Sequence, residues 1–214
     1  MEMILNEIEA RILGSLIEKE MTTPDYYPLT LNALTNACNQ KSNRDPVMSL
    51  EKNIIIRTLD EMRIKKLVVQ KEAMDSRVPK YAQTLDTLFG FSQKEVALIC
   101  ALLLRGPQTV GEIHIHTSRM NKFNDLSDVE ATLKELAERE GGPFIIKLPR
   151  QSGQRESRYA HLFCGEVDFE KIASAQINTE NGDRLAKLET ALDSLRSEFD
   201  ELRQRFFEFI KQFE

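Results

Sequence analysis

A chain of 214 residues is long enough for two small domains, and its 41% hydrophobic content can fill two modest cores. The net charge is −5, and most of the acidity lies at one end. Residues 1–90 carry 12 basic and 13 acidic side chains, residues 91–163 carry 10 and 9, and residues 164–214 carry 7 and 12. This composition excludes a strongly basic protein, so binding of phosphate groups would need a local basic face.

The cysteines and the amino terminus indicate a cytoplasmic protein. Cys38, Cys100 and Cys164 lie far apart and form no Cys-x-x-Cys pair, which is typical of reduced thiols. The opening Met-Glu-Met-Ile-Leu-Asn-Glu lacks the basic and apolar regions of a signal peptide. The longest apolar run, 96–104, is too short to cross a bilayer, and no membrane partner is expected.

The first forty residues predict two helices separated by a break. Asn6 is placed to cap a helix over about 7–20, with Glu9 completing a capping box. This helix has one apolar stripe, made of Ile8, Ile12, Leu13, Leu16 and Ile17. The segment 22–28 contains two prolines and ends the helix, and Thr30 then caps a short second helix.

A polar segment, a third helix and a hairpin follow over residues 38–83. We expect Pro46 near the start of the third helix, which ends near Lys66. The spacing predicts Ile55, Leu59 and Met62 inside, and Lys52, Asn53, Arg57 and Asp60 outside. Residues 67–69 and 80–82 predict two strands around a turn at 74–79.

The same plan returns in the second half of the chain. The apolar stripe of the first helix matches the segment 95–103 at an offset of 86, and residues 58–62 match 132–136 at an offset of 74. Residues 80–83 match 158–161 at an offset of 78, which predicts a second hairpin over 144–148 and 158–163. The pattern predicts an α+β, mainly helical fold. We expect two tandem winged-helix domains over 1–90 and 91–165.

The carboxyl-terminal part, 166–214, predicts a polar linker and a long amphipathic helix. From residue 183 onward the apolar residues recur at spacings of three and four over about four heptads. These are Leu185, Leu188, Leu192, Leu195, Phe199, Leu202, Phe206, Phe209 and Phe213. Two alternatives remain open: a coiled coil that forms a homodimer through 184–214, or a helix that packs on the same chain.

Several long motifs resemble the YceH family of bacterial proteins. They are the opening helix 5–20, the segment Thr-Thr-Pro-Asp-Tyr-Tyr-Pro at 22–28, Ala-Cys-Asn-Gln-Lys-Ser-Asn-Arg-Asp-Pro-Val at 37–47, and the run from Gly90 to Ile113. The resemblance covers nearly the whole chain and implies a tandem winged-helix fold. It implies no established activity, and therefore no catalytic residue.

The polar segment is the first candidate site. Asn and Gln side chains pair with adenine, and Arg or Lys with guanine, in the major groove. A turn whose side chains only cap the backbone is the alternative. Further cations lie on the third helix and on the two hairpins. The candidate contacts to duplex DNA are Asn39, Gln40, Lys41, Ser42, Asn43, Arg44, Lys52, Arg57, Arg77, Lys80, Arg150 and Arg155.

The third helix of the second half, 128–140, exposes mostly acidic residues in this prediction and would repel a major groove. Two classes of function therefore stay open. The first is a DNA-binding protein, with a transcriptional regulator in view, that reads DNA through the first half. The second is a winged-helix scaffold that docks other proteins and binds no DNA.

Catalysis is not expected. His114 and His116 are two positions apart on a predicted helix, so their side chains diverge. Cys100 lies in an apolar stripe, and Cys38 has a nearby Lys41 but no neighbouring histidine in the sequence. Neither a phosphate-binding loop nor a dinucleotide fingerprint is present. We expect no enzyme activity, no cofactor and no metal site.

Overall fold

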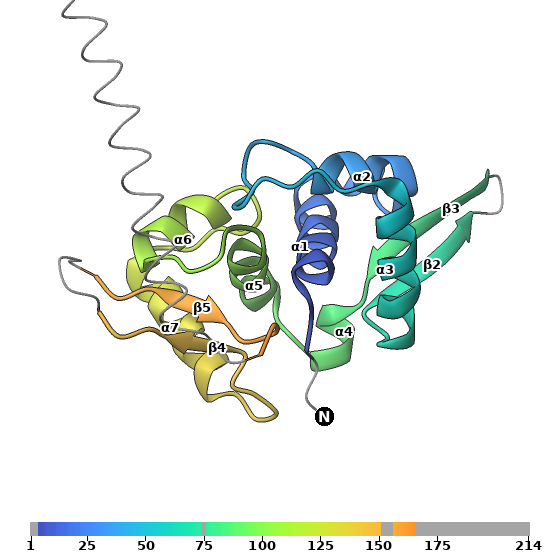
Figure 1. Cartoon of the computed structure of the whole chain (residues 1–214). Helices are drawn as coiled ribbons and strands as arrows, with labels where there is room; N and C mark the ends of the chain where they lie inside the picture. Colours follow the sequence, from blue (N-terminus) through green and yellow to red (C-terminus); the bar gives the residue numbers. More distant parts are fainter. Residues whose placement is uncertain (1–3, 74–75, 151–155, 166–214) are drawn as a thin grey trace, which may run out of the picture. The chain divides into compact units, whose positions relative to one another are not determined.

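The computed structural model describes residues 4–73, 76–150 and 156–165 (Figure 1). The described residues all belong to one compact unit, the first of the chain. The predicted linker and amphipathic helix at 166–214 therefore lie outside the described residues, and both alternatives for that segment stay predictions.

The first half contains a helical group and a three-stranded sheet. Its elements are α1 (Glu7–Thr22), the 3-10 turn η1 (Pro24–Tyr26), β1 (Leu29–Thr30), α2 (Leu31–Cys38), α3 (Lys52–Ile64), β2 (Val68–Ala73), β3 (Ser76–Gln83) and α4 (Leu85–Phe89). The strands are antiparallel in the order β1-β3-β2, with Leu29 opposite Tyr81 and Val69 opposite Ala82. The predicted caps at Asn6 and Thr30 are confirmed.

The second half repeats this order with shorter strands. Its elements are α5 (Gln93–Arg105), α6 (Val110–Thr117), α7 (Leu126–Glu138), β4 (Ile145–Lys147) and β5 (Tyr159–His161). β4 and β5 form an antiparallel pair, and Gln108 forms an isolated bridge to Tyr159, much as Leu29 pairs with Tyr81 in the first half. The predicted α+β class, with helices as the main element, is confirmed for the described residues.

Each half joins its first helix to its third by an ion pair between a buried glutamate and a half-buried cation. Glu9 and Glu95 complete capping boxes on α1 and α5, and both side chains are buried. The Glu9 carboxylate also meets Lys65 Nζ at 2.7 Å, and the Glu95 carboxylate meets the guanidinium of Arg139. Lys65 and Arg139 are the first residues after α3 and α7. Each glutamate therefore caps one helix and fixes the carboxyl end of another.

Two leucines hold the same place in the two halves. Leu59 is the eighth residue of the 13-residue α3, and Leu133 is the eighth residue of the 13-residue α7. Both are at most 1% exposed. The predicted core positions Ile55 and Met62 are also buried. The predicted inward face of the third helix is therefore confirmed.

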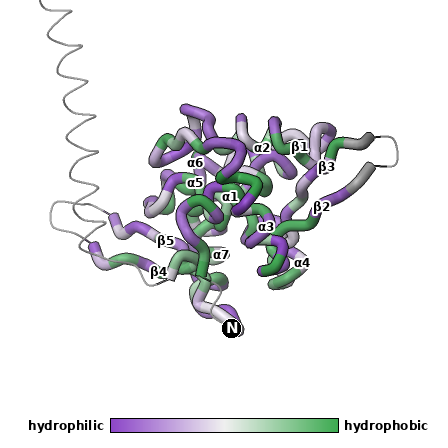
Figure 2. Tube along the Cα trace, turned by 45° about the vertical axis from the view of Figure 1, so that its right-hand side comes forward, coloured by the Kyte–Doolittle hydropathy of each residue, from purple (hydrophilic) through white to green (hydrophobic). Residues whose placement is uncertain are grey.

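α1 and α5 pack against each other in the middle of the first unit, with the two hairpins on opposite sides of this pair (Figure 1). Figure 2 shows that hydrophobic residues gather on these two helices. Their approach is close at Gly14, whose carbonyl accepts a hydrogen bond from Cys100 Sγ at 3.3 Å. An added Cβ at Gly14 would lie 2.9 Å from Leu104 Cδ2. The small residue at this position therefore allows the contact.

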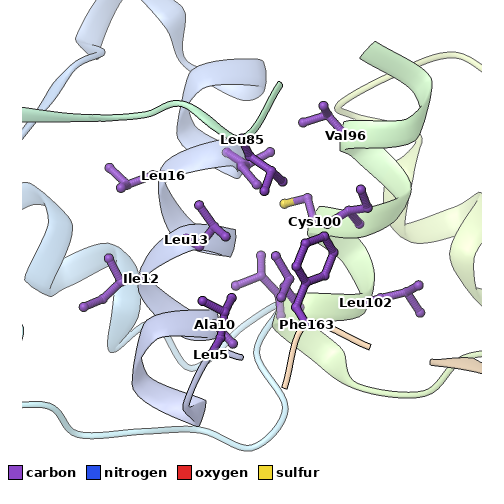
Figure 3. Packing of buried hydrophobic residues seen from close by; sticks show 14 of the residues in the cluster. Leu5, Ala10, Ile12, Leu13, Leu16, Leu85, Val96, Cys100, Leu102 and Phe163 are labelled. Carbon is purple, nitrogen blue, oxygen red and sulfur yellow. The ribbon is translucent and has the colours of Figure 1, made fainter. Parts of the chain in front are cut away.

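The buried core runs through both halves without a break (Figure 3). Leu5 N donates to Phe163 O at 2.6 Å, which joins the start of the first half to the end of the second. Four phenylalanine rings form a cluster at centroid distances of 4.9–6.3 Å: Phe89 stacks on Phe91 and Phe144 stacks on Phe163, and the contacts between these two pairs are edge-on. Because this core is continuous, the expected division into separate domains at residue 90 stays a prediction.

Candidate nucleic-acid interface

The polar segment forms a loop between α2 and α3, which we call the polar loop (39–51). α3 begins at Lys52, so the expectation that Pro46 lies near the start of this helix is wrong. The loop is closed by Asn39, whose amide donates to Leu50 O at 2.9 Å and accepts from Leu50 N at 2.7 Å. The candidate residues 40–44 therefore lie in the loop and not on α3, while the two bonds to Leu50 bring Asn39 close to the start of that helix.

Burial of Arg44 corrects the expectation that its charge faces a nucleic acid. Its side chain has 0% exposure, and its Nη2 lies 2.7 Å from Glu18 Oε2 on α1. The same guanidinium donates to the carbonyls of Ala37 and Asn43 and to Gln40 Oε1. A buried arginine needs this full set of acceptors because an unpaired charge would be costly. Arg44 thus cross-links the polar loop to α1.

Arg11 is a second arginine buried beneath the polar loop. Its Nη1 donates to Cys38 O at 3.2 Å and its Nη2 donates to Pro46 O at 2.5 Å, whereas Nε has no partner among the described residues. Burial lowers the pKa of Arg11, and the nearby charge of Arg44 lowers it further. Two guanidinium groups therefore fix the path of the polar loop from below.

Four other loop candidates keep some access to solvent. Lys41, Ser42 and Asn43 are exposed, and Gln40 is half-buried because its Oε1 accepts from Lys19 Nζ and from Arg44. Asn43 also accepts a short hydrogen bond from Arg105 of α5. Asp45 N donates to Leu104 O at 2.9 Å, which holds the loop against the end of α5. Lys41 is thus the exposed cation of the polar loop.

The outer face of α3 is where the predicted contacts remain available. Lys52, Asn53 and Arg57 are all exposed, as predicted. This face also carries acidic and apolar groups. Its acidic groups are Asp60 and Glu61, and Asp60 pairs with Arg63 at 3.3 Å. Its apolar groups are Ile54, Ile56 and Ile64, of which Ile64 is 83% exposed.

The first hairpin places two lysines side by side. Lys71 on β2 lies directly opposite Lys80 on β3 in the antiparallel register. Like charges in this position repel, and a bound phosphate would relieve the repulsion. Lys71 is exposed and Lys80 is half-buried. Arg77 lies on β3, but its side chain is not among those the structure describes.

The second half offers fewer free cations. Arg150 is exposed, whereas Arg155 lies outside the described residues. Arg158 is engaged by Glu112, at 2.9 Å, and by Pro107 O. The outer face of α7 exposes three glutamates, Glu130, Glu135 and Glu138, against the one lysine Lys134, as the sequence predicted.

A cavity beside the polar loop was not predicted from the sequence. It has a volume of about 250 Å³, and we call it the junction cavity because residues of α1, the polar loop, α5 and α6 line it. Its basic lining is Lys19, Arg105, His116 and Arg119. Lys19, Arg105 and His116 lie in the last turns of three helices, and this position was visible in the sequence. Their convergence depends on the α1–α5 packing.

The thiols and imidazoles show no catalytic arrangement in the described part of the chain. Burial raises the pKa of Cys38 to about 11, and it also raises the pKa of Cys100. Burial lowers the pKa of His161 to about 4, and its Nδ1 is buried without a partner there. Between residues 4 and 165, the described histidine, cysteine and acidic side chains form no group that could hold a metal ion.

The described residues form an α+β fold that presents exposed cations on α3, on the first hairpin and on the polar loop. A family model described as "Protein of unknown function, DUF480" matches residues 5–154, and the chain belongs to this family. In the described ranges, no helix is both long and apolar enough to pass through a membrane.

The curated relatives cover the chain almost end to end. A UPF0502 protein of Vibrio parahaemolyticus is 50% identical over 208 residues, which are 95% of this chain and 96% of that protein. A UPF0502 protein of Pelobacter propionicus is 49% identical over 221 residues, and one of Geobacter sulfurreducens is 51% identical over 223 residues; both cover 100% of each chain. The predicted resemblance to a family of bacterial proteins without an established activity is confirmed.

Proposed function

We propose that the protein is a tandem winged-helix protein that binds duplex DNA through its first half and acts as a transcriptional regulator. The repeated order of elements supports the fold: a helix, a short strand or bridge, two helices and a hairpin, twice over. In such a fold the third helix enters the major groove and the hairpin lies along the backbone.

The exposed face of α3 carries the proposal. Asn53 can pair with an adenine edge, and Lys52 and Arg57 can reach guanine edges or phosphates. The paired lysines Lys71 and Lys80 on the adjoining hairpin would contact phosphates. α7 exposes glutamates at the corresponding place, so the second half would not enter a groove. The proposed contact is therefore asymmetric within one chain.

A salt titration tests this contact. We expect the double variant Lys52→Gln, Arg57→Gln to bind random duplex DNA more weakly, because two cations that can contact phosphates are lost. Each lost phosphate contact should also flatten the slope of log affinity against log salt by about 0.9. Fluorescence anisotropy at several salt concentrations gives both the affinity and the slope. Lys134→Gln, an exposed lysine of α7, is the matched control and should leave both unchanged.

A specific observation favours protein docking as the second candidate function. Ile54, Ile56 and Ile64 are exposed on α3, and Val69 is exposed on the neighbouring strand β2. Ile64 and Val69 line the same shallow hollow, and exposed apolar residues that gather on one surface are typical of protein interfaces. If the unmodified chain does not bind duplex DNA even at low salt, or if the double variant keeps the same affinity and slope, the DNA proposal fails and docking becomes the better account.

We propose in addition that residues 184–214 pair two chains into a homodimer. The seam of leucines and phenylalanines repeats every 3.5 residues on average, which keeps one face toward a partner helix. Burial of one such side chain stabilises by about 1.5–3 kcal/mol, so nine of them favour a covered face. We expect light scattering to give twice the chain mass for the whole protein and the single mass after deletion of 184–214. A monomeric whole chain would contradict the dimer.

A further inference from the structure

The junction cavity has a polar and basic lining that the proposed DNA contact does not use. Its volume is about 250 Å³. Arg105, Arg119 and Lys19 supply positive charge, and the side chains of Gln40 and Ser42 in the polar loop also line the cavity. Drug-sized ligands fill pockets of about 300–1,000 Å³, so this cavity suits a smaller molecule.

Positive charge around the junction cavity is only partly neutralised. Glu18, the acidic residue of the lining, is already engaged by Arg44 and by Lys19, at 2.7 and 3.2 Å. Arg105 donates to a neutral acceptor, the Asn43 amide. Arg119 is exposed and has no hydrogen bond or ion pair with the described residues. An anion entering the cavity would therefore meet two guanidinium groups that pair with no carboxylate of the described residues.

Helix dipoles alone account for part of this arrangement. A cation in the last turn of a helix is stabilised by the negative carboxyl end, which explains Lys19 and Arg105 individually. The terminal carbonyls already have donors: Lys19 O accepts from Thr23, Leu102 O from Gly106, and Ile115 O from Ser118. The dipole effect does not explain why the ends of three helices bring Lys19, Arg105 and the His116 imidazole to one hollow that residues of the polar loop also line.

We propose that the junction cavity binds a small organic phosphate. Arg105 and Arg119 would hold the phosphoryl group, because a guanidinium fork matches two phosphate oxygens. Gln40, Ser42 and Asn43 would hydrogen-bond a hydroxylated body such as a sugar. The ligand would touch the first half through the polar loop and the second half through α5 and α6, and would thereby join them.

Calorimetric titration of the full chain without DNA tests the site, so its outcome is independent of the proposed function. The probes are ribose 5-phosphate, inorganic phosphate, ribose and succinate at constant ionic strength. We expect ribose 5-phosphate to bind at least about tenfold more tightly than inorganic phosphate, and ribose and succinate not to bind. Arg119→Gln should weaken ribose 5-phosphate by roughly tenfold or more, as expected for a charged hydrogen bond. Arg63→Gln, on exposed α3, is the matched control.

His116 provides a second readout. Burial and the charge of Arg105 lower its pKa, while Glu112 opposes this; its Nδ1 contacts Gln108. A bound phosphate should raise the pKa of His116 in an NMR titration, and Arg119→Gln should abolish that rise. The proposal is overturned if ribose 5-phosphate does not bind at millimolar concentration, if succinate binds equally well, or if Arg119→Gln binds with full affinity and the same His116 shift.

Discussion

Replacing Arg44 with alanine is expected to lower the free energy of unfolding by about 3–5 kcal/mol, because the change leaves a buried carboxylate without its partner. Glu18 would keep only Lys19, whose Nζ lies 3.2 Å away. The carbonyl of Ala37, which now accepts from Arg44 Nε and Nη2, would lose both donors. Chemical denaturation followed by circular dichroism measures the loss.

Two variants distinguish the cross-link that Arg44 forms to Glu18 and Ala37 from a simple effect of its charge. Lys41→Ala removes an exposed cation of the same loop and should change stability by no more than about 0.5 kcal/mol. Arg44→Lys keeps the charge but should not restore full stability, since an ammonium cannot span both Glu18 oxygens and the Ala37 carbonyl. A loss below about 1 kcal/mol in Arg44→Ala would show that the guanidinium is solvated.

The ion pair of Glu18 and Arg44 also predicts the direction in which stability changes with pH. Burial alone would raise the pKa of Glu18, but the hydrogen bonds and charge of Arg44 outweigh it and hold that pKa below its ordinary value of 4.5. The unfolded chain therefore binds the proton more readily, and the stability from this pair is lost as the pH falls below about 4.5. Arg44→Ala should lose less stability than the unmodified protein over the same acid range.

Local signals in the sequence predicted the helix starts well. Asn6 with Glu9, and Thr30, lie next to the backbone groups they cap, so a few neighbouring residues determine these caps. Pro46 misled the prediction because a proline suits an extended loop as well as the first turn of a helix. The helix begins six residues later, at Lys52.

Long-range contacts were beyond such signals. Arg44 was expected on the surface because it stands among polar residues, and its partner Glu18 is 26 positions earlier on another helix. The junction cavity depends on the packing of α1 against α5, which no local pattern describes. The ion pair of Arg139 with Glu95, however, could have been predicted from the sequence repeat. Lys65 and Arg139 are separated by the same offset of 74 that relates residues 58–62 to 132–136.

Replacing Leu59 or Leu133 with alanine is expected to cost about 2–5 kcal/mol in each case, because both leucines are fully buried and a cavity would remain. Equivalent positions in α3 and α7 predict similar losses. Ile64→Ala and Leu126→Ala are the controls on the same two helices, since their side chains are 83% and 50% exposed. Thermal denaturation of the full chain, followed by circular dichroism and by calorimetry, measures all four.

The number of transitions decides whether the two halves are separate domains. The core is continuous across α1 and α5, and the bonds from Leu5 to Phe163 and from Asp45 to Leu104 cross between the halves. We therefore expect one cooperative transition for residues 4–165, which either leucine variant shifts as a whole. If Leu59→Ala moves one transition and Leu133→Ala another, the halves unfold independently. In that case the contact between α1 and α5 is a docking interface between two domains, and the predicted boundary at residue 90 is a physical one.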